Sequence, residues 1–136
     1  MKILLERIFP ASTEVLAGVR SALRDACRQA ACSDECSDQI VLAINEACMN
    51  SIQHGYRFAD GQQFTLRLGV DDDMLVADLL DNGLPATDVD LRPRELDELR
   101  PGGLGVRFMR ELMDGVRYLP APEGFTNRLQ LSKRIF

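Results

Sequence analysis

One helix constrains this chain more than any other segment, because its apolar and polar residues form two separate stripes. The stretch 37–55 contains no proline, and its apolar residues recur with helical spacing. The arc expected to face a core consists of Ile40, Ile44, Ala47 and Ser51. Beside it runs a polar stripe of residues four apart, which are neighbours on a helix: Glu46, Asn50 and His54.

The polar stripe suggests chemistry at the border of the core. A carboxylate and a carboxamide one turn apart, Glu46 and Asn50, suit a hard cation such as Mg²⁺, or a base beside a metal-bound phosphate. The alternative is that both side chains lie just outside the core and are solvated. The helix by itself does not choose between these two interpretations.

Composition bounds the class of protein. The 136 residues fit one domain, 1–136, and are 46% hydrophobic and 27% charged. A net charge of −5 and the lack of a basic tract argue against a nucleic-acid partner. No apolar run reaches the roughly 18 residues of a membrane span, and charge appears too early for a signal peptide. We therefore expect a cytoplasmic protein.

The four cysteines do not follow a zinc-site spacing. No two of the cysteines form a Cys-x₂-Cys pair; they are Cys27, Cys32, Cys36 and Cys48. The single histidine lies far from the first three. We interpret them as reduced, partly buried thiols, with a metal site or redox switch as the alternative.

Hydrophobic patterns predict an α/β (α+β) two-layer sandwich. The predicted strands are 2–9, 62–70, 74–80, 116–119 and 125–135, and the predicted helices are 12–31, 37–55 and 102–114. Ser37 is the expected N-cap of the second helix, and Gly115 the expected C′ residue of the third. This order indicates a mixed, mostly antiparallel sheet with about three helices on one face.

Two further signals follow the helix in the chain. Asp81 and Gly83 come where a strongly apolar strand ends, so the carboxylate can accept from the amine of a purine. The cluster Gly102-Gly103-Leu104-Gly105 opens a helix, where bare amides and the helix dipole form a phosphate cradle. The long proline-containing connection between them, at about 84–102, has the character of a nucleotide lid.

Together these motifs resemble the ATP-binding superfamily of histidine kinases, type II topoisomerases, mismatch-repair ATPases and a heat-shock chaperone, the Bergerat or GHKL fold. Within it, the sequence is most similar to the bacterial anti-sigma-factor serine kinases. The segments 42–56, 81–83 and 102–109 look like their N box and two glycine boxes, and 112–118 and 126–129 look like their closing segments.

The resemblance implies a role for each motif residue. Asn50 would bind Mg²⁺ on ATP, Glu46 would be the general base, and Asp81 would bind the adenine amine with Gly83 leaving room for the base. Phosphate would meet the backbone of Gly103 and Gly105 in the second glycine box, which Gly102 and Leu104 complete. Thr126 would support Asp81 at the adenine, directly or by way of a water molecule. Arg100 would be a transition-state cation or a solvated lid residue, and Leu84-Pro85 stands where the family often has a second glycine.

The resemblance also implies partners. The protein would be an ATP-dependent protein-serine kinase that phosphorylates a STAS-domain anti-anti-sigma protein, and it would also hold a sigma factor and form a homodimer through its first strand and helix. Two alternatives remain open at this point. One is a non-catalytic ATP-binding switch module that binds a regulatory protein, and the other is the detached ATP-binding domain of a larger signalling kinase.

Overall fold

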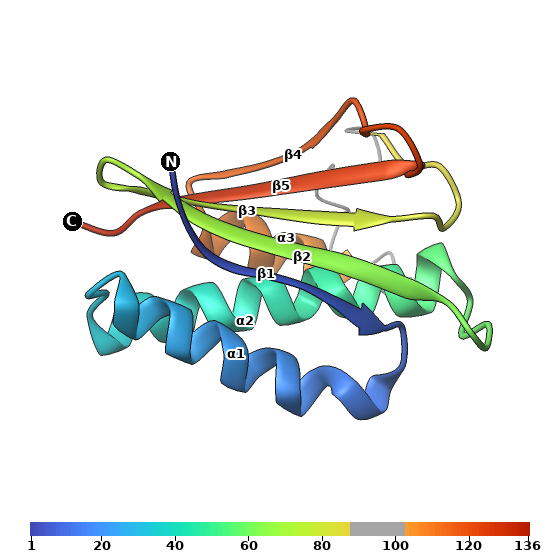
Figure 1. The fold of residues 1–136 in the computed structure, drawn as a ribbon, viewed down its shortest axis with the longest axis horizontal. Helices are drawn as coiled ribbons and strands as arrows, with labels where there is room; N and C mark the ends of the chain where they lie inside the picture. Colours follow the sequence, from blue (N-terminus) through green and yellow to red (C-terminus); the bar gives the residue numbers. More distant parts are fainter. Residues whose placement is uncertain (88–102) are drawn as a thin grey trace.

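A five-stranded sheet with three helices on one face forms the molecule. In the computed structural model, residues 1–87 and 103–136 are described, and the sheet lies above the helices (Figure 1). Its strands are β1 (Lys2–Pro10), β2 (Gln63–Asp71), β3 (Met74–Asp81), β4 (Gly115–Leu119) and β5 (Asn127–Arg134). The helices are α1 (Leu16–Gln29), α2 (Asp34–Asn50) and α3 (Gly103–Leu112). The predicted sandwich is confirmed.

The sheet is antiparallel throughout, whereas a mixed, mostly antiparallel sheet was predicted. The strand order is β1-β2-β3-β5-β4, and all four neighbouring pairs are antiparallel. The helical connection through α3 leaves β4 running in the same direction as β3. However, β5 lies between these two strands, so no parallel pair forms in the described residues.

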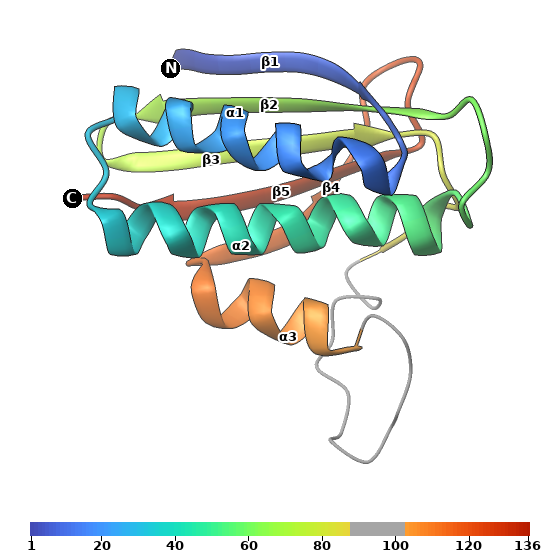
Figure 2. The same cartoon turned by 90° about the horizontal axis from the view of Figure 1, so that it is seen from below.

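The core lies between the helices and the inner face of the sheet. Apolar residues from every layer are fully buried there, among them Val19, Leu23, Ile40, Ile44, Leu66, Leu68, Leu75 and Leu131. Viewed from the helical side, α1 lies in front of β2 and β3, and α2 lies between α1 and α3 (Figure 2). The stripe of apolar residues predicted for the second helix is therefore its core-facing side.

Helix ends follow local capping chemistry, with two corrections. Ser12 caps the 3₁₀ turn Thr13–Val15 before α1 by accepting from Glu14 N. Ser33, not Ser37, is the N-cap of α2: its Oγ accepts from Cys36 N at 3.1 Å, and Asp34 and Glu35 then face the positive helix end. Gly115 is not a left-handed C′ residue, because it begins β4.

The last turn of the second helix widens. After Asn50 the chain continues as a π-helical turn, Ser51–Gly55, in which Tyr56 N donates to Ser51 O at 2.9 Å. Such turns frequently occur at functional sites. Here the wide turn brings Ser51 and Gly55 against the end of β3.

The described part of the chain contains no helix that is long and apolar enough to cross a membrane. The four cysteines are free thiols, as predicted. The described residues also contain no group of three or more His, Cys, Asp or Glu side chains that could hold a metal ion.

Candidate nucleotide site

The start of α3 lies directly against the polar stripe of α2. Glu46 and Asn50 are half-buried, and a Cβ atom built on Gly105 would lie 2.8 Å from Glu46 Oε2 and 3.8 Å from Asn50 Oδ1. Real Cβ atoms essentially never come within 3.0 Å of another atom, so only glycine fits at position 105 without displacing Glu46. Three predicted site residues, distant in the sequence, are thus brought together.

The donor atoms at this junction fit a Mg²⁺–nucleotide. Asn50 and Glu46 present an amide oxygen and a carboxylate, which are hard ligands. Mg²⁺ in phosphate sites usually takes one or two protein oxygens and completes its shell with phosphates and water. The backbone amides at the start of α3 face outward from a helix N-terminus, which favours a phosphate group.

The second part of the site is the carboxylate of Asp81, at the end of β3. Asp81 is 7% exposed, and its carboxylate accepts three hydrogen bonds. Ser51 Oγ donates to Oδ2 at 2.8 Å, while Asn127 Nδ2 and Gly83 N donate to Oδ1 at 2.9 and 3.0 Å. These donors fix the orientation of the carboxylate, as a recognition group requires.

Tyr56 holds the backbone that follows Asp81. Its hydroxyl donates to Gln63 O and accepts from Asn82 N, both at 2.6 Å. Burial raises the pKa of Tyr56 above 10.0, so the hydroxyl stays protonated and can donate at neutral pH. The end of β3 is therefore tied to both the π-helical turn and β2.

Gly83 and Thr126 lie near Asp81, but with contacts that the sequence did not indicate. A Cβ on Gly83 would lie 2.7 Å from the carbonyl carbon of Gly55, so this glycine is needed for packing against the π-helical turn. Thr126 Oγ1 donates to Gly83 O at 2.9 Å and to Asp81 O at 3.3 Å. Thr126 thus contacts the main chain of Asp81, while Asn127 contacts its carboxylate.

The other predicted residues are divided between two regions. Gly103 and Leu104 belong to the first turn of α3. Arg100 and Gly102 lie outside the described residues, as does most of the predicted lid. His54, the third member of the polar stripe, is exposed.

Three residues around Asp81 were missed from the sequence: Ser51, Tyr56 and Asn127. A weak signal existed for Ser51, which is a polar residue on the core-facing arc of its helix. The sequence also held a weak signal for Asn127, because this residue is in phase with the buried Leu129 and Leu131 of β5. A polar residue at a buried position needs a partner, and here the partner is Asp81.

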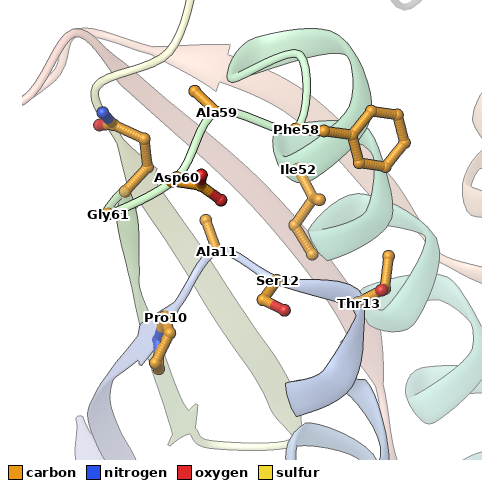
Figure 3. Close-up of a pocket in the computed structure, with 10 residues that line it drawn as sticks. Pro10, Ala11, Ser12, Thr13, Ile52, Phe58, Ala59, Asp60 and Gly61 are labelled. Carbon is orange, nitrogen blue, oxygen red and sulfur yellow. The ribbon is translucent and has the colours of Figure 1, made fainter.

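A separate pocket lies on the other side of the π-helical turn. Its volume is about 190 Å³, and it is lined by the end of β1, the residues just after it, Ile52 and the loop 58–62 (Figure 3). It shares no residue with the predicted nucleotide site. This pocket is therefore distinct from the predicted nucleotide site.

Comparison with known proteins agrees with this arrangement. The histidine kinase-like ATPase domain family matches residues 9–133, which is most of the chain. The chain belongs to this family. It is 33% identical over 122 residues to the serine-protein kinase RsbW of Bacillus subtilis (strain 168), a match that covers 83% of this chain and 76% of the relative. The predicted family and the predicted enzyme class, a serine-protein kinase, are confirmed.

Two solved structures share the fold. The RsbU and RsbW domains of a Mycobacterium tuberculosis protein match with a TM-score of 0.67 and 18% identity, over 96% of this chain and 31% of that chain. The SiaB–SiaC complex of Pseudomonas aeruginosa matches with a TM-score of 0.65 and 16% identity, over 97% of this chain and 90% of that chain. At these identities the likeness establishes the architecture.

Proposed function

We propose that this kinase transfers the γ-phosphoryl group of ATP to a serine of a STAS-domain anti-anti-sigma protein. The observation that carries the proposal is the junction of α2 and α3, where Gly105 leaves room for the Glu46 carboxylate beside Asn50. A nucleotide-binding module without transfer chemistry needs no base at this point. The similarity to serine-protein kinases supports the same conclusion.

Glu46 is the general base in this proposal. The serine oxygen forms a bond to the γ-phosphorus, the bond from that phosphorus to the bridging oxygen breaks, and ADP leaves. The serine proton passes to the Glu46 carboxylate, one helical turn from Asn50. Asn50 holds Mg²⁺, which when bound neutralises charge on the phosphates.

The nucleotide spans the two parts of the site. Asp81 accepts from the adenine amine, Gly83 and Thr126 hold the backbone beside it, and the second glycine box, with Gly103, Leu104 and Gly105, offers amides to the phosphates. Gly102 and Arg100 remain predictions for the same region, the first as part of the phosphate cradle and the second as the transition-state cation.

The biological output is a partner switch. Phosphorylation adds about −2 charge to the serine of the STAS partner, which breaks a small interface by repulsion and desolvation. The kinase is then free to bind a sigma factor. We also propose a homodimer through β1, because β1 is an edge strand and exposes Ile3 and Ile8 by 39% and 61%.

The first test is nucleotide binding, measured by calorimetry with and without Mg²⁺. The native protein binds ATP, Asp81→Asn abolishes binding, and Asn50→Ala removes the dependence on Mg²⁺. The second test is transfer of radiolabelled phosphate from ATP to a purified STAS-domain protein encoded in the same genome. Glu46→Gln retains ATP binding and loses transfer.

Glu35→Gln is the matched control, because Glu35 is an exposed glutamate in the first turn of the same helix. It leaves binding and transfer unchanged. Native protein that binds no adenine nucleotide refutes the proposed function. Transfer that persists in Glu46→Gln refutes the assignment of the base.

A further inference from the structure

Every hydrogen-bonding atom of the Asn127 side chain is engaged at the purine end of the site. Asn127 is 6% exposed. Its Nδ2 donates to Asp81 Oδ1 and to Leu84 O, both at 2.9 Å. Its Oδ1 accepts from Ala86 N, also at 2.9 Å. An amide has two N–H donors, so both donors of Asn127 are used.

The register of the sheet places this side chain. Asp81, the last residue of β3, lies opposite Asn127, the first residue of β5, in the ladder that joins the two strands. The side chain of Asn127 therefore lies between the Asp81 carboxylate and the backbone at 84–86, which leaves β3. One side chain thus links the recognition carboxylate to the first residues of the connection.

The remaining acceptor capacity of Asp81 decides what it can bind. A carboxylate has about four acceptor positions, and Ser51, Gly83 and Asn127 fill three of them. The position left on Oδ2 takes a donor, such as the 6-amino group of a purine. It repels an acceptor, such as the 6-oxo group of guanine, so its direction determines which purine fits.

We infer that Asn127 is the positioning residue that gives this site its selectivity for a 6-amino purine. The inference rests on the proposed function, because it requires the base to lie against Asp81. Without the Asn127 donor, the carboxylate rotates about its last side-chain bond and Oδ1 gains a free acceptor position. The segment 84–86 also loses two of its contacts.

The test compares ATP and GTP affinities, measured by calorimetry in the native protein and in Asn127→Ala. The variant weakens ATP binding about tenfold and lowers the preference for ATP over GTP by a similar factor, which corresponds to one hydrogen bond to a charged group. Gln130→Ala is the control. Gln130 is on the same strand and donates to Asp78 at 3.2 Å, away from Asp81, so both affinities stay within about twofold.

Asn127→Asp gives a readout that a purely structural role would not change. The introduced carboxyl retains the size of the amide and still accepts from Ala86 N, but in its ionised form it faces the Asp81 carboxylate without a donor. Lowering the pH from about 8 to about 6 restores a donor toward Asp81, so ATP affinity rises relative to the native protein at the same pH. Tyr56, whose hydroxyl holds the backbone just after Asp81, has its pKa raised above 10.0 and stays protonated throughout.

The outcomes separate this inference from the proposed function. Suppose that Asn127→Ala prefers ATP over GTP as strongly as the native protein does, while Asp81→Asn loses ATP binding. This result overturns the role of Asn127 and leaves the kinase proposal intact. If Asn127→Ala does not fold, as judged by circular dichroism, Asn127→Asp decides: affinity relative to native that does not change with pH overturns the inference. Absence of ATP binding in the native protein overturns both.

Discussion

Gly83 packs on the backbone of Gly55, so that a Cβ atom at position 83 would lie 2.7 to 2.9 Å from three backbone atoms of Gly55. Leu84 N also donates to Gly55 O at 2.9 Å, which ties the end of β3 to the π-helical turn. At Gly55 and Gly83 the two segments meet main chain against main chain, with no side chain between them. Neither can move to accommodate a larger residue without breaking that contact.

Gly83→Ala therefore destabilises the fold. The added methyl group meets backbone, and overpacking of this kind costs about 1–3 kcal/mol in the free energy of unfolding. Urea unfolding followed by circular dichroism measures the loss. Gly18→Ala is the matched control, because Gly18 is an exposed residue of α1 with nothing within 4 Å of its Cβ position. The control gains about 0.5–1 kcal/mol from helix propensity. Equal stability of the two variants contradicts the packing argument.

Gly105→Ala, in contrast to Gly83→Ala, lowers activity and leaves the stability of the fold intact. The new Cβ meets Glu46 Oε2, the end of a flexible side chain, which moves aside at little cost to the fold. Stability is unchanged or rises by up to about 1 kcal/mol, since alanine is the better helix former. Phosphoryl transfer falls by about 10²-fold, because the general base no longer has its position.

Two measurements check the Gly105 variant together: the melting temperature and the rate of phosphate transfer to a STAS-domain protein. Loss of activity together with loss of the fold contradicts the prediction, and so does a fully active variant. Glu46→Gln provides the reference for complete loss of the base. The dissociation between stability and activity is what identifies Gly105 as a residue kept for function.

The sequence allowed the individual parts of the site to be predicted better than their connections. Glu46 and Asn50 share a stripe because the helical period fixes their phase, and Asp81 was placed at a strand end because the apolar run stops there. The contacts of Asp81 with Ser51 and Asn127 depend on strand register and on the π-helical turn, which join residues 30 and 46 positions apart. No local pattern encodes such pairings.

The same reason explains the errors in the fold. Ser33 and Ser37 are both good N-caps, and the chain uses the earlier one, where acidic residues follow at once. The parallel component of the predicted mixed, mostly antiparallel sheet came from element order, but the insertion of β5 between β3 and β4 is a choice of topology. Helix and strand types were correct because they depend on periodicity, which is local.

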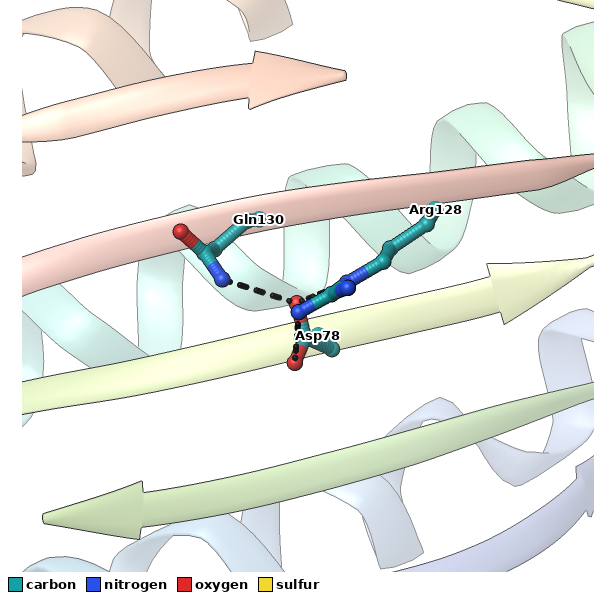
Figure 4. A network of polar contacts seen from close by, with 3 residues as sticks. All are labelled: Asp78, Arg128 and Gln130. Carbon is teal, nitrogen blue, oxygen red and sulfur yellow. Dashed lines mark hydrogen bonds and ion pairs between the residues drawn. The ribbon is translucent and has the colours of Figure 1, made fainter. Parts of the chain in front are cut away.

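Asp78 anchors a polar cluster on the sheet face opposite the helices (Figure 4). Its carboxylate accepts from Arg128 Nε at 3.0 Å and Gln130 Nε2 at 3.2 Å, and its side chain is 14% exposed. Asp78→Ala leaves both donors without this partner, so the free energy of unfolding falls by about 1–3 kcal/mol. ATP affinity stays within about twofold of native, because the Asp78 side chain lies on the sheet face opposite the helix that carries Glu46 and Asn50.

Asp25→Ala is the control for Asp78. Asp25 pairs with Arg28 at 2.6 Å, but both side chains are more than 60% exposed. An exposed pair of this kind contributes at most about 0.5 kcal/mol. Thermal unfolding separates the two variants. If Asp25→Ala loses as much stability as Asp78→Ala, partial burial does not explain how much the Asp78 cluster contributes to the free energy of unfolding.

Cys48 makes stability depend on alkaline pH. The thiol is fully buried in α2, and burial raises its pKa from 9.0 to about 12. Below pH 9 the thiol is protonated in both the folded and unfolded chains, so it adds no pH dependence. Between pH 9 and about 12 the unfolded chain ionises and the folded chain does not, so the free energy of unfolding falls by up to about 1.4 kcal/mol per pH unit.

Urea unfolding at a series of pH values from about 8 to about 11 measures this slope. Cys48→Ala loses stability at neutral pH through a small cavity, but its decline above pH 9 is shallower than that of the native protein. The raised pKa values of Cys27 and Cys32 still contribute in the variant, so the slope decreases without vanishing. Val41→Ala, a buried truncation in the same helix, lowers stability equally at every pH. Parallel slopes in the native protein and Cys48→Ala refute the effect of the buried thiol, because no other group is changed.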